Sequence, residues 1–176
     1  MTARGGRLVP VVVALGVTLP LLLVGLRCAS RRPPPPRLLF PVEGAEREGL
    51  KNGFRERRGW IRRHEALDIA APRRTPVRAV ADGVVVRLRT SPAGGRSLEQ
   101  MDAAGRHCYY YAHLEAYAAN MQPGQRVQRG DVVAYVGSSG NAPEHFPHLH
   151  FAVFEVAEPG PTCWTGTPID PYPLFD

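Results

Sequence analysis

Glycine and proline punctuate this chain from end to end, and they restrict its fold more than any other feature. Its 176 residues include 18 prolines and 18 glycines. Proline removes a backbone donor and glycine weakens regular elements, so short strands joined by turns are favoured over long helices. With 44% hydrophobic and 22% charged residues, both near globular averages, the chain can build a core. Its length fits one ordinary domain after any targeting segment is subtracted.

The first thirty residues follow the pattern of a targeting segment. Arg4 and Arg7 precede an uncharged stretch rich in Val and Leu over residues 8–26, and Arg27 follows it. A stretch of this length can span a bilayer and exceeds the usual apolar region of a cleaved signal. We therefore expect residues 1–30 to be a signal peptide or a membrane anchor. Either fate implies export to the cell envelope, outside the cytoplasm.

A proline run separates this segment from the rest of the chain. The sequence R-R-P-P-P-P begins at Arg31 and fits neither helix nor sheet. We interpret residues 31–37 as a proline-rich spacer and residues 38–176 as the folded domain. The spacer would hold a retained anchor close to that domain.

The positive charge does not indicate a nucleic-acid partner. The formal net charge is +6, and arginines beside the apolar segment supply part of it. The densest basic run, residues 55–63 around Trp60, is interpreted as a solvated loop rim rather than a phosphate-binding patch. We expect no nucleic-acid partner.

Short β-type runs with turn residues between them occupy the expected domain. The Asp82-Gly83 pair between two valine-rich runs predicts a β-hairpin. One short helix is expected over residues 114–121. These features favour a mostly β, antiparallel domain. The expected strands cover residues 77–80, 84–88, 108–114, 132–136 and 148–156.

Two cysteines, Cys108 and Cys163, lie in the expected domain. Outside the cytoplasm such a pair can oxidise to a disulfide. Cys108 equally fits a small buried thiol, because it alternates with Tyr109 on an expected strand. The sequence leaves both alternatives open, and we favour the buried thiol.

Four of the six histidines and one aspartate fall into three short motifs. These are H-E-A-L-D over residues 64–68, Y-A-H-L around His113, and H-L-H over residues 148–150. Residues two apart on a strand point to one face about 6 to 7 Å apart, which suits one metal ligand beside one base. The same alternation places Tyr109, Tyr111 and His113 on one face.

His64 and Asp68 require a bend in the chain. On a straight strand they would lie about 13 Å apart, whereas ligands of one zinc converge to within about 4 Å. We expect His64 in an entering loop and Asp68 at the start of a strand. Imidazole nitrogen with carboxylate oxygen suits Zn²⁺, and three protein ligands leave a position for water, as in catalytic zinc sites.

The order of these motifs resembles the lysostaphin/LytM-like zinc metallopeptidases, which cut peptides of the bacterial cell wall. The chain carries H-E-A-L-D-I-A-A-P-R-R-T-P-V, then Y-Y-A-H-L, then V-G-S-S-G-N, then F-P-H-L-H-F. The resemblance implies an antiparallel, β-sandwich-like domain with an open groove. It also implies a zinc ion held by His64, Asp68 and His150, and a catalytic pair formed by His113 and His148.

The implied reaction is hydrolysis of peptide cross-links in peptidoglycan by water activated at zinc. We assign His148 to accept or orient the water proton and to assist the leaving amine. His113 would orient the water or stabilise the oxyanion, and the two roles can be exchanged. The expected partners are peptidoglycan peptides, the membrane if the first segment is retained, and a regulatory protein.

Some residues depart from the family pattern. Ala66 and Arg74 stand where the family commonly has glycine, which predicts an altered loop near the metal. The stretch R-S-L-E-Q-M-D-A-A-G lacks the usual strand pattern of the family. His107 and His145 match no motif, and we expect both at the surface.

Two other classes of protein deserve comparison. Relatives that have lost zinc ligands bind and activate cell-wall amidases, but the complete ligand set argues against such a non-catalytic regulator. The run G-Q-R-V-Q-R-G-D-V-V resembles hairpins of biotinyl or lipoyl carrier modules. A carrier needs a modified lysine on that turn, and the only lysine is Lys51, outside it.

Overall fold

The structure is a computed structural model and describes residues 37–45, 47, 50–58 and 62–176. The expected targeting segment and nearly all of the proline spacer lie outside these residues. The described part consists of β-strands and short 3-10 helices, with no α-helix. No helix in these ranges is long and apolar enough to cross a membrane. The strands are β1 (Arg57–Arg58), β2 (Arg62–Arg63), β3 (Leu67–Ala70), β4 (Pro76–Arg78), β5 (Gly83–Ser91), β6 (Gly95–Asp102), β7 (His107–Tyr117), β8 (Arg126–Val127), β9 (Val132–Val136), β10 (His148–Glu155) and β11 (Thr167–Ile169), with helices η2 (Cys163–Thr165) and η3 (Tyr172–Leu174).

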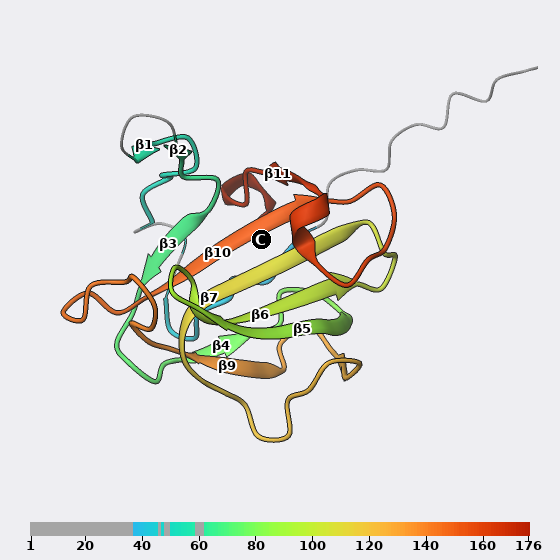
Figure 1. Cartoon of the computed structure of the whole chain (residues 1–176), viewed down its shortest axis with the longest axis horizontal. Helices are drawn as coiled ribbons and strands as arrows, with labels where there is room; N and C mark the ends of the chain where they lie inside the picture. Colours follow the sequence, from blue (N-terminus) through green and yellow to red (C-terminus); the bar gives the residue numbers. More distant parts are fainter. Residues whose placement is uncertain (1–36, 46, 48–49, 59–61) are drawn as a thin grey trace, which may run out of the picture. The chain divides into compact units, whose positions relative to one another are not determined.

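The strands form a large antiparallel sheet, which confirms the expected mostly β class. The hydrogen-bonded order is β11-β10-β7-β6-β5-β8, while β3 pairs with the other end of β10. Strand β9 pairs with the end of β7 and with β4, and Figure 1 shows these two strands beside the main sheet. β10 therefore lies between β7 on one side and β3 on the other.

One face of this sheet is buried in the main apolar core, and the other carries the polar site residues. Residues at alternate positions of β3, β7 and β10 enter one large apolar cluster, which includes Leu67, Tyr111 and Phe151. Side chains from β4 and β9 close that cluster. The opposite face carries a smaller cluster and also Asp68 and His150, which are opposite each other in the β3–β10 register. Because pleated strands alternate their side chains, burial of the first face leaves the polar residues together on the second.

The predicted hairpin at Asp82-Gly83 is wrong. Strand β4 pairs with β9, and β5 pairs with β6 and β8. Gly83 is required for close approach instead of a turn, since a Cβ built on it would lie 2.1 Å from the carbonyl oxygen of Met101 on β6. The local turn signal could not reveal this, because the close approach of the backbone of another strand determines the need for glycine.

The predicted helix over residues 114–121 is also wrong. Strand β7 continues to Tyr117, and a turn closed by the Met121 N–H and the Ala118 carbonyl follows it. Pairing of Leu114 with Val136 on β9 supplies long-range hydrogen bonds that override the weak local helix preference. The atypical stretch from Gly95 to Asp102 forms a complete strand, β6, despite its departure from the family pattern.

Cys108 and Cys163 form a disulfide, so the preferred thiol alternative is wrong. Both cysteines are fully buried, as the alternation on β7 indicated for Cys108. The bond ties η2 to β7 across 55 residues of sequence. Sequence spacing could not predict the pairing, because it depends on how far the segment after β10 folds back over the sheet.

The expected surface position of His107 is wrong as well. His107 begins β7 and is only 9% exposed. Its Nδ1 lies 3.0 Å from Oδ2 of Asp102, so the pair joins the two ends of the β6–β7 connection. His145 is exposed, as expected.

Candidate metal centre

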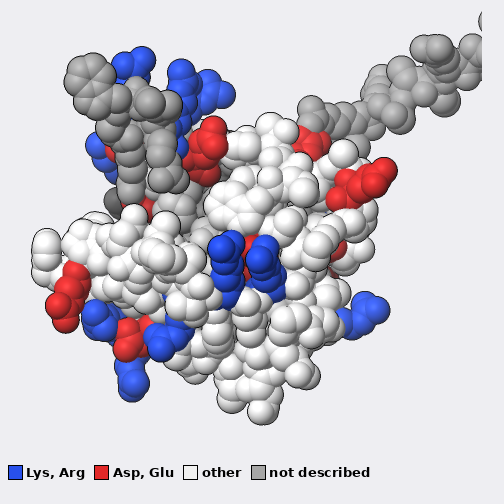
Figure 2. All heavy atoms as spheres, viewed as in Figure 1, with Lys and Arg blue, Asp and Glu red and all other residues white. Residues whose placement is uncertain are grey.

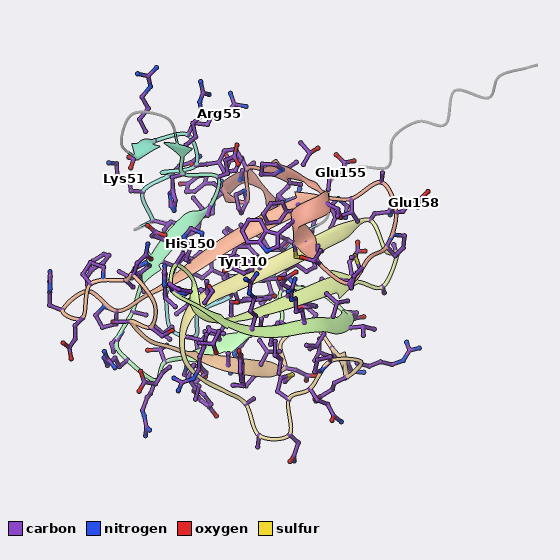
Figure 3. The ribbon with its side chains drawn as sticks, viewed as in Figure 1. Lys51, Arg55, Tyr110, His150, Glu155 and Glu158 are labelled. Atoms are coloured by element: carbon purple, nitrogen blue, oxygen red, sulfur yellow. A yellow bond between two sulfur atoms is a disulfide. The ribbon has the colours of Figure 1, made fainter. Side chains whose placement is uncertain are left out.

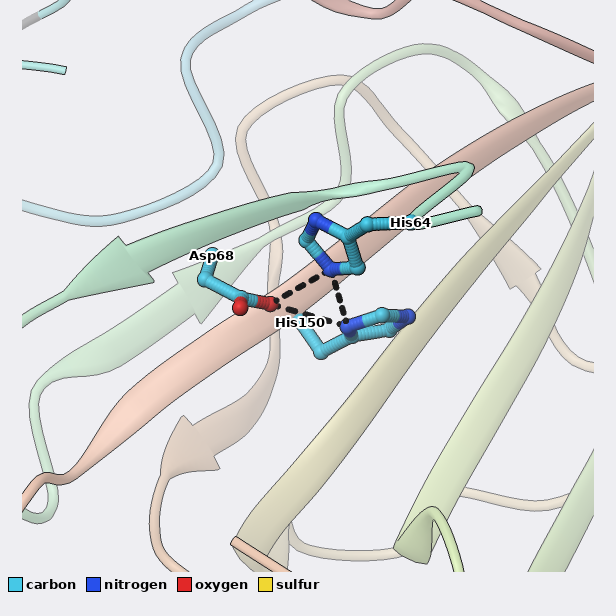
Figure 4. A group of neighbouring side chains, drawn as sticks. All are labelled: His64, Asp68 and His150. Atoms are coloured by element: carbon cyan, nitrogen blue, oxygen red, sulfur yellow. Dashed lines mark hydrogen bonds and ion pairs between the residues drawn. The ribbon is translucent and has the colours of Figure 1, made fainter. Parts of the chain in front are cut away.

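Three of the predicted site residues meet on the polar face of the sheet. Asp68 comes from β3, His150 from β10, and His64 from the bend between β2 and β3. Asp68 Oδ1 lies 3.1 Å from His64 Nε2 and 2.9 Å from His150 Nδ1. The two imidazole nitrogens are 3.2 Å apart, and Figure 4 shows all three side chains converging on one point. The bend expected after His64 is present, because residues 64–66 lie between the two strands.

The donor set of this cluster fits a zinc ion. Two imidazole nitrogens and one carboxylate oxygen are ordinary zinc ligands, and atoms bound at about 2.0 to 2.2 Å in a tetrahedron lie about 3.3 to 3.6 Å from each other, slightly farther than the three donors here. His64 is 5% exposed, and its Nδ1 is buried without a hydrogen-bond partner among the described residues. If Nε2 binds a cation, the neutral ring carries its hydrogen on Nδ1.

Asp68 is held in its ionised form. Burial alone would raise the pKa of this carboxyl, but the hydrogen bonds with His150 and His64 outweigh that effect and keep its pKa far below the usual range. An ionised carboxylate oxygen between two imidazoles can serve as a ligand for a cation. The electrostatics therefore agree with the geometry of the cluster.

His148 and His113 lie beside the three donors. Nε2 of His148 is 3.8 Å from Oδ1 of Asp68. The ring of His113 has its centroid 4.9 Å from that of His148 and 5.6 Å from that of His150. The structure thus brings all five predicted site residues into one place.

The expectation that His113 shares a face with Tyr109 and Tyr111 is wrong. Both tyrosines enter the large apolar cluster on the opposite face. His113 has a φ of 59°, and the pairing of β7 shifts its register nearby. The left-handed residue interrupts the alternation and turns the His113 side chain toward Tyr110 on the polar face.

Backbone carbonyls determine which ring nitrogen of each catalytic candidate carries hydrogen. Nδ1 of His113 lies 2.8 Å from the Ser139 carbonyl oxygen, and Nδ1 of His148 lies 2.9 Å from that of Phe146. A carbonyl only accepts, so each Nδ1 must donate its hydrogen. Nε2 of both rings is then the basic nitrogen when the ring is neutral.

The Gly-rich turn V-G-S-S-G-N supports His113. Its Ser139 supplies the carbonyl described above, and the Ser139 hydroxyl donates to the Leu114 carbonyl at 2.8 Å. A Cβ at Gly137 would lie 2.4 Å from the backbone nitrogen of Glu115, so only glycine lets this turn approach β7. The motif signalled its glycines, but sequence reasoning did not identify the role of Ser139.

Burial lowers the pKa of His113 to about 4, and the hydrogen bond to Ser139 only partly opposes this effect. His113 is therefore neutral at physiological pH. A neutral ring that donates through Nδ1 offers a lone pair at Nε2, so it accepts a hydrogen bond in the site.

Two of the three donors, His64 and His150, open onto a pocket of about 330 Å³. Sequence reasoning missed several residues of its wall, since Tyr110, Trp164 and Arg63 line it together with His64, His113 and His150. The position of Arg63 next to His64 could have indicated that it lies in the wall. No sequence feature could place Tyr110 and Trp164 there, because their positions depend on strand pairing and on the disulfide beside Trp164.

Arg74 shows why its position in the motif favours glycine. It has a φ of 67° in the turn closed by the Thr75 N–H and the Pro72 carbonyl. A side chain in that region is strained, whereas glycine is not. At Arg74, the loop alteration that we expected therefore takes the form of local backbone strain. Ala66, the other residue that replaces a family glycine, is buried and has no positive φ, so it is not strained in this way.

Comparison with known protein families gives one match. The sequence profile of Peptidase family M23 matches residues 62–171, which is more than half of the chain and includes all five site residues. A curated relative, the L-Ala--D-Glu endopeptidase of Bacillus subtilis (strain 168), is 35% identical over 120 residues. That alignment covers 65% of this chain but only 35% of the relative.

Two solved structures share the fold. The catalytic domain of the antimicrobial peptidase lysostaphin from Staphylococcus simulans has a TM-score of 0.55 and 29% identity, over 64% of this chain and 78% of that chain. A zinc containing peptidase from Vibrio cholerae has a TM-score of 0.60 and 27% identity, over 77% of this chain and 39% of that chain.

Proposed function

The chain belongs to Peptidase family M23, a family of metallopeptidases, and from this premise we propose that it is an exported zinc endopeptidase that hydrolyses peptide cross-links of bacterial peptidoglycan. The observation that carries the proposal is the convergence of His64, Asp68 and His150, whose three donor atoms lie 2.9 to 3.2 Å from each other. These residues would hold the ion through His64 Nε2, Asp68 Oδ1 and His150 Nδ1. When bound there, zinc supplies a Lewis acid that polarises a carbonyl and makes water acidic enough to attack it near neutral pH.

His148 is the proposed general base. Its Nδ1 donates to the Phe146 carbonyl, so the lone pair of Nε2 is available, 3.8 Å from Asp68 Oδ1. At that place Nε2 can take the proton of the attacking water and then deliver it to the nitrogen of the departing amine. The backbone carbonyl keeps the ring in the required tautomer and orientation.

His113 is proposed to orient the water rather than to stabilise an oxyanion. A ring that donates through Nδ1 to Ser139 has no second hydrogen to offer unless it is protonated. Its pKa of about 4 opposes protonation. In this proposal Nε2 of His113 accepts a hydrogen bond from the water, and His148 remains our choice for the general base.

The substrate assignment rests on relatives and on chemistry outside the site. A relative named as an L-Ala--D-Glu endopeptidase supports a peptide of the cell wall as substrate. The Cys108–Cys163 disulfide supports an oxidising compartment, as does the apolar segment over residues 8–26. Together they favour action outside the cytoplasm, close to the membrane if the first segment is retained.

The decisive experiment incubates the zinc-loaded full chain with cross-linked muropeptide dimers and with denatured general protein. We expect the dimers to be cut and identified by mass spectrometry, with no cutting after EDTA or in the His148→Ala variant. Digestion of denatured protein with intact dimers would replace the proposal with a broader metalloprotease. If neither is cut while the chain stimulates a cell-wall amidase, it is a regulator instead.

A further inference from the structure

The groove continues beyond the metal centre. A second hollow of about 390 Å³ adjoins the first, and the two share Ala93, Gly94, Tyr110 and Trp164 in their walls. Tyr110 lines both hollows, and Figure 3 shows it close to His150. A chain bound at the metal centre can therefore extend over Tyr110 into the second hollow.

Trp164 forms an exposed but rigid wall of this groove. Its side chain is 56% exposed, which is unusual for a large apolar residue. Its ring contacts Tyr110 and Phe154 edge-on, with centroids 5.1 and 5.3 Å away. The preceding residue, Cys163, is held by the disulfide to Cys108.

A buried carboxylate strengthens this attachment. The backbone N–H of Cys163 donates to Glu99 Oε2 at 2.7 Å, and Glu99 is 1% exposed. The indole thus keeps its place without a ligand, and binding to it costs little conformational entropy. Exposed aromatic residues that are held in this way are typical of recognition surfaces.

The charges along the groove are mainly positive. Arg63 lines the first hollow and Arg89 lines the second, and both are exposed. Neither has an ion-pair partner among the described residues. Glu99 lines the second hollow, but it is buried beneath the wall and bonded to Cys163. Figure 2 shows further Lys and Arg side chains at the corner formed by β1 and β2, where Figure 3 labels Arg55.

We infer that the groove formed by the two hollows is a subsite for an acidic peptide, in which Arg63 in the first hollow and Arg89 in the second bind free carboxylates and the Tyr110–Trp164 wall packs against the apolar part of the peptide. The inference rests on the proposed function and narrows its substrate to stem peptides that carry free carboxylates, instead of neutral glycine bridges. Guanidinium groups are the usual partners of carboxylates, since they donate two parallel hydrogen bonds.

The test compares two substrates that differ only in charge. The zinc-loaded full chain is given an acidic muropeptide dimer with free α-carboxylates and the same dimer with those groups amidated. Arg63→Gln and Arg89→Gln should each raise KM for the acidic dimer about 3- to 10-fold and leave KM for the amidated dimer unchanged. Arg106→Gln, an exposed arginine at the far end of β6 and β7, is the matched control and should change neither.

Trp164→Ala separates the aromatic wall from the charges. It should raise KM for both dimers by a similar factor, because the packing does not depend on the carboxylates. Equal KM values for the two dimers in the wild type, or arginine variants that match Arg106→Gln, would overturn the inference.

A binding measurement tests the subsite independently of the proposed catalytic function. If the wild type cuts neither dimer, the proposed function fails, and calorimetry of the zinc-free full chain with the acidic and amidated peptides decides the subsite. Tighter binding of the acidic peptide, lost in Arg63→Gln, supports the inference. Equal binding of the two peptides contradicts it.

Discussion

His64 Nε2 and His150 Nδ1 face each other at 3.2 Å, although 86 residues separate them in the sequence. Two imidazole nitrogens at this distance beside an ionised carboxylate form a site for a cation, because each can offer a lone pair to it. The pairing of β3 with β10 creates this relationship, since it places Asp68 opposite His150.

We predict that His150→Ala abolishes stoichiometric zinc binding by the full chain, because two ligands bind zinc much more weakly than three. Metal analysis after dialysis measures the occupancy, and zinc should no longer raise the thermal unfolding temperature. His145→Ala, which removes an exposed histidine of the preceding loop, is the control and should retain one zinc. Full occupancy in His150→Ala would show that the ligand assignment is wrong.

We predict that His148→Ala and His113→Ala retain zinc but lose about 10²- to 10⁴-fold in kcat, as expected for removal of a general base or a water-orienting group. Dimer cleavage measures the rate, and metal analysis of the same samples measures the occupancy. His107→Gln lies outside the site and should keep its turnover if it still folds. A residue whose alanine variant turns over normally has no part in the reaction.

The His113 imidazole should titrate near pH 4 in the zinc-free folded chain, below the value of about 6.5 for an exposed histidine. Since the folded pKa is lowered, its contribution to stability is complete above pH 6.5 and is lost as the pH falls through about 4. Histidine ring signals in NMR spectra measure the titration. Urea unfolding at pH 7 and pH 4 measures the effect. Between these two values, the free energy of unfolding of the wild type should fall by roughly 2 to 3 kcal/mol more than that of His113→Gln. Parallel pH profiles of the two proteins would refute the shift.

Replacing Arg74 by glycine should stabilise the chain by roughly 0.5 to 1 kcal/mol, because it relieves the strain of a φ of 67° and removes no described side-chain contact. Arg74→Ala keeps the strained conformation and should give no gain. Arg73→Gly should destabilise, since Arg73 pairs with Glu115 at 2.9 Å. Urea unfolding of the three variants checks the order, and an equal effect of glycine and alanine at position 74 would rule out the strain explanation.

The sequence by itself determined the β class of the domain and the residues of the candidate site. Turn residues and β-branched runs are local signals, so they predicted short strands and several of their positions. The three histidine motifs also identified every member of the group that the structure brings together, because their residue types and order match a family pattern. The bend after His64 followed from distance alone.

Only the tertiary structure decided how those pieces meet. The Asp82-Gly83 pair signals a hairpin locally, but the approach of β6 to Gly83 explains the glycine. The left-handed backbone of His113 and the Cys108–Cys163 disulfide also depend on segments distant in sequence. Strand pairing and disulfide formation join segments that are distant in sequence. Which partners pair depends on all the alternatives in the chain, so a local sequence pattern cannot predict the result. For the same reason the wall of Tyr110 and Trp164 beside the metal centre became visible only in the folded chain.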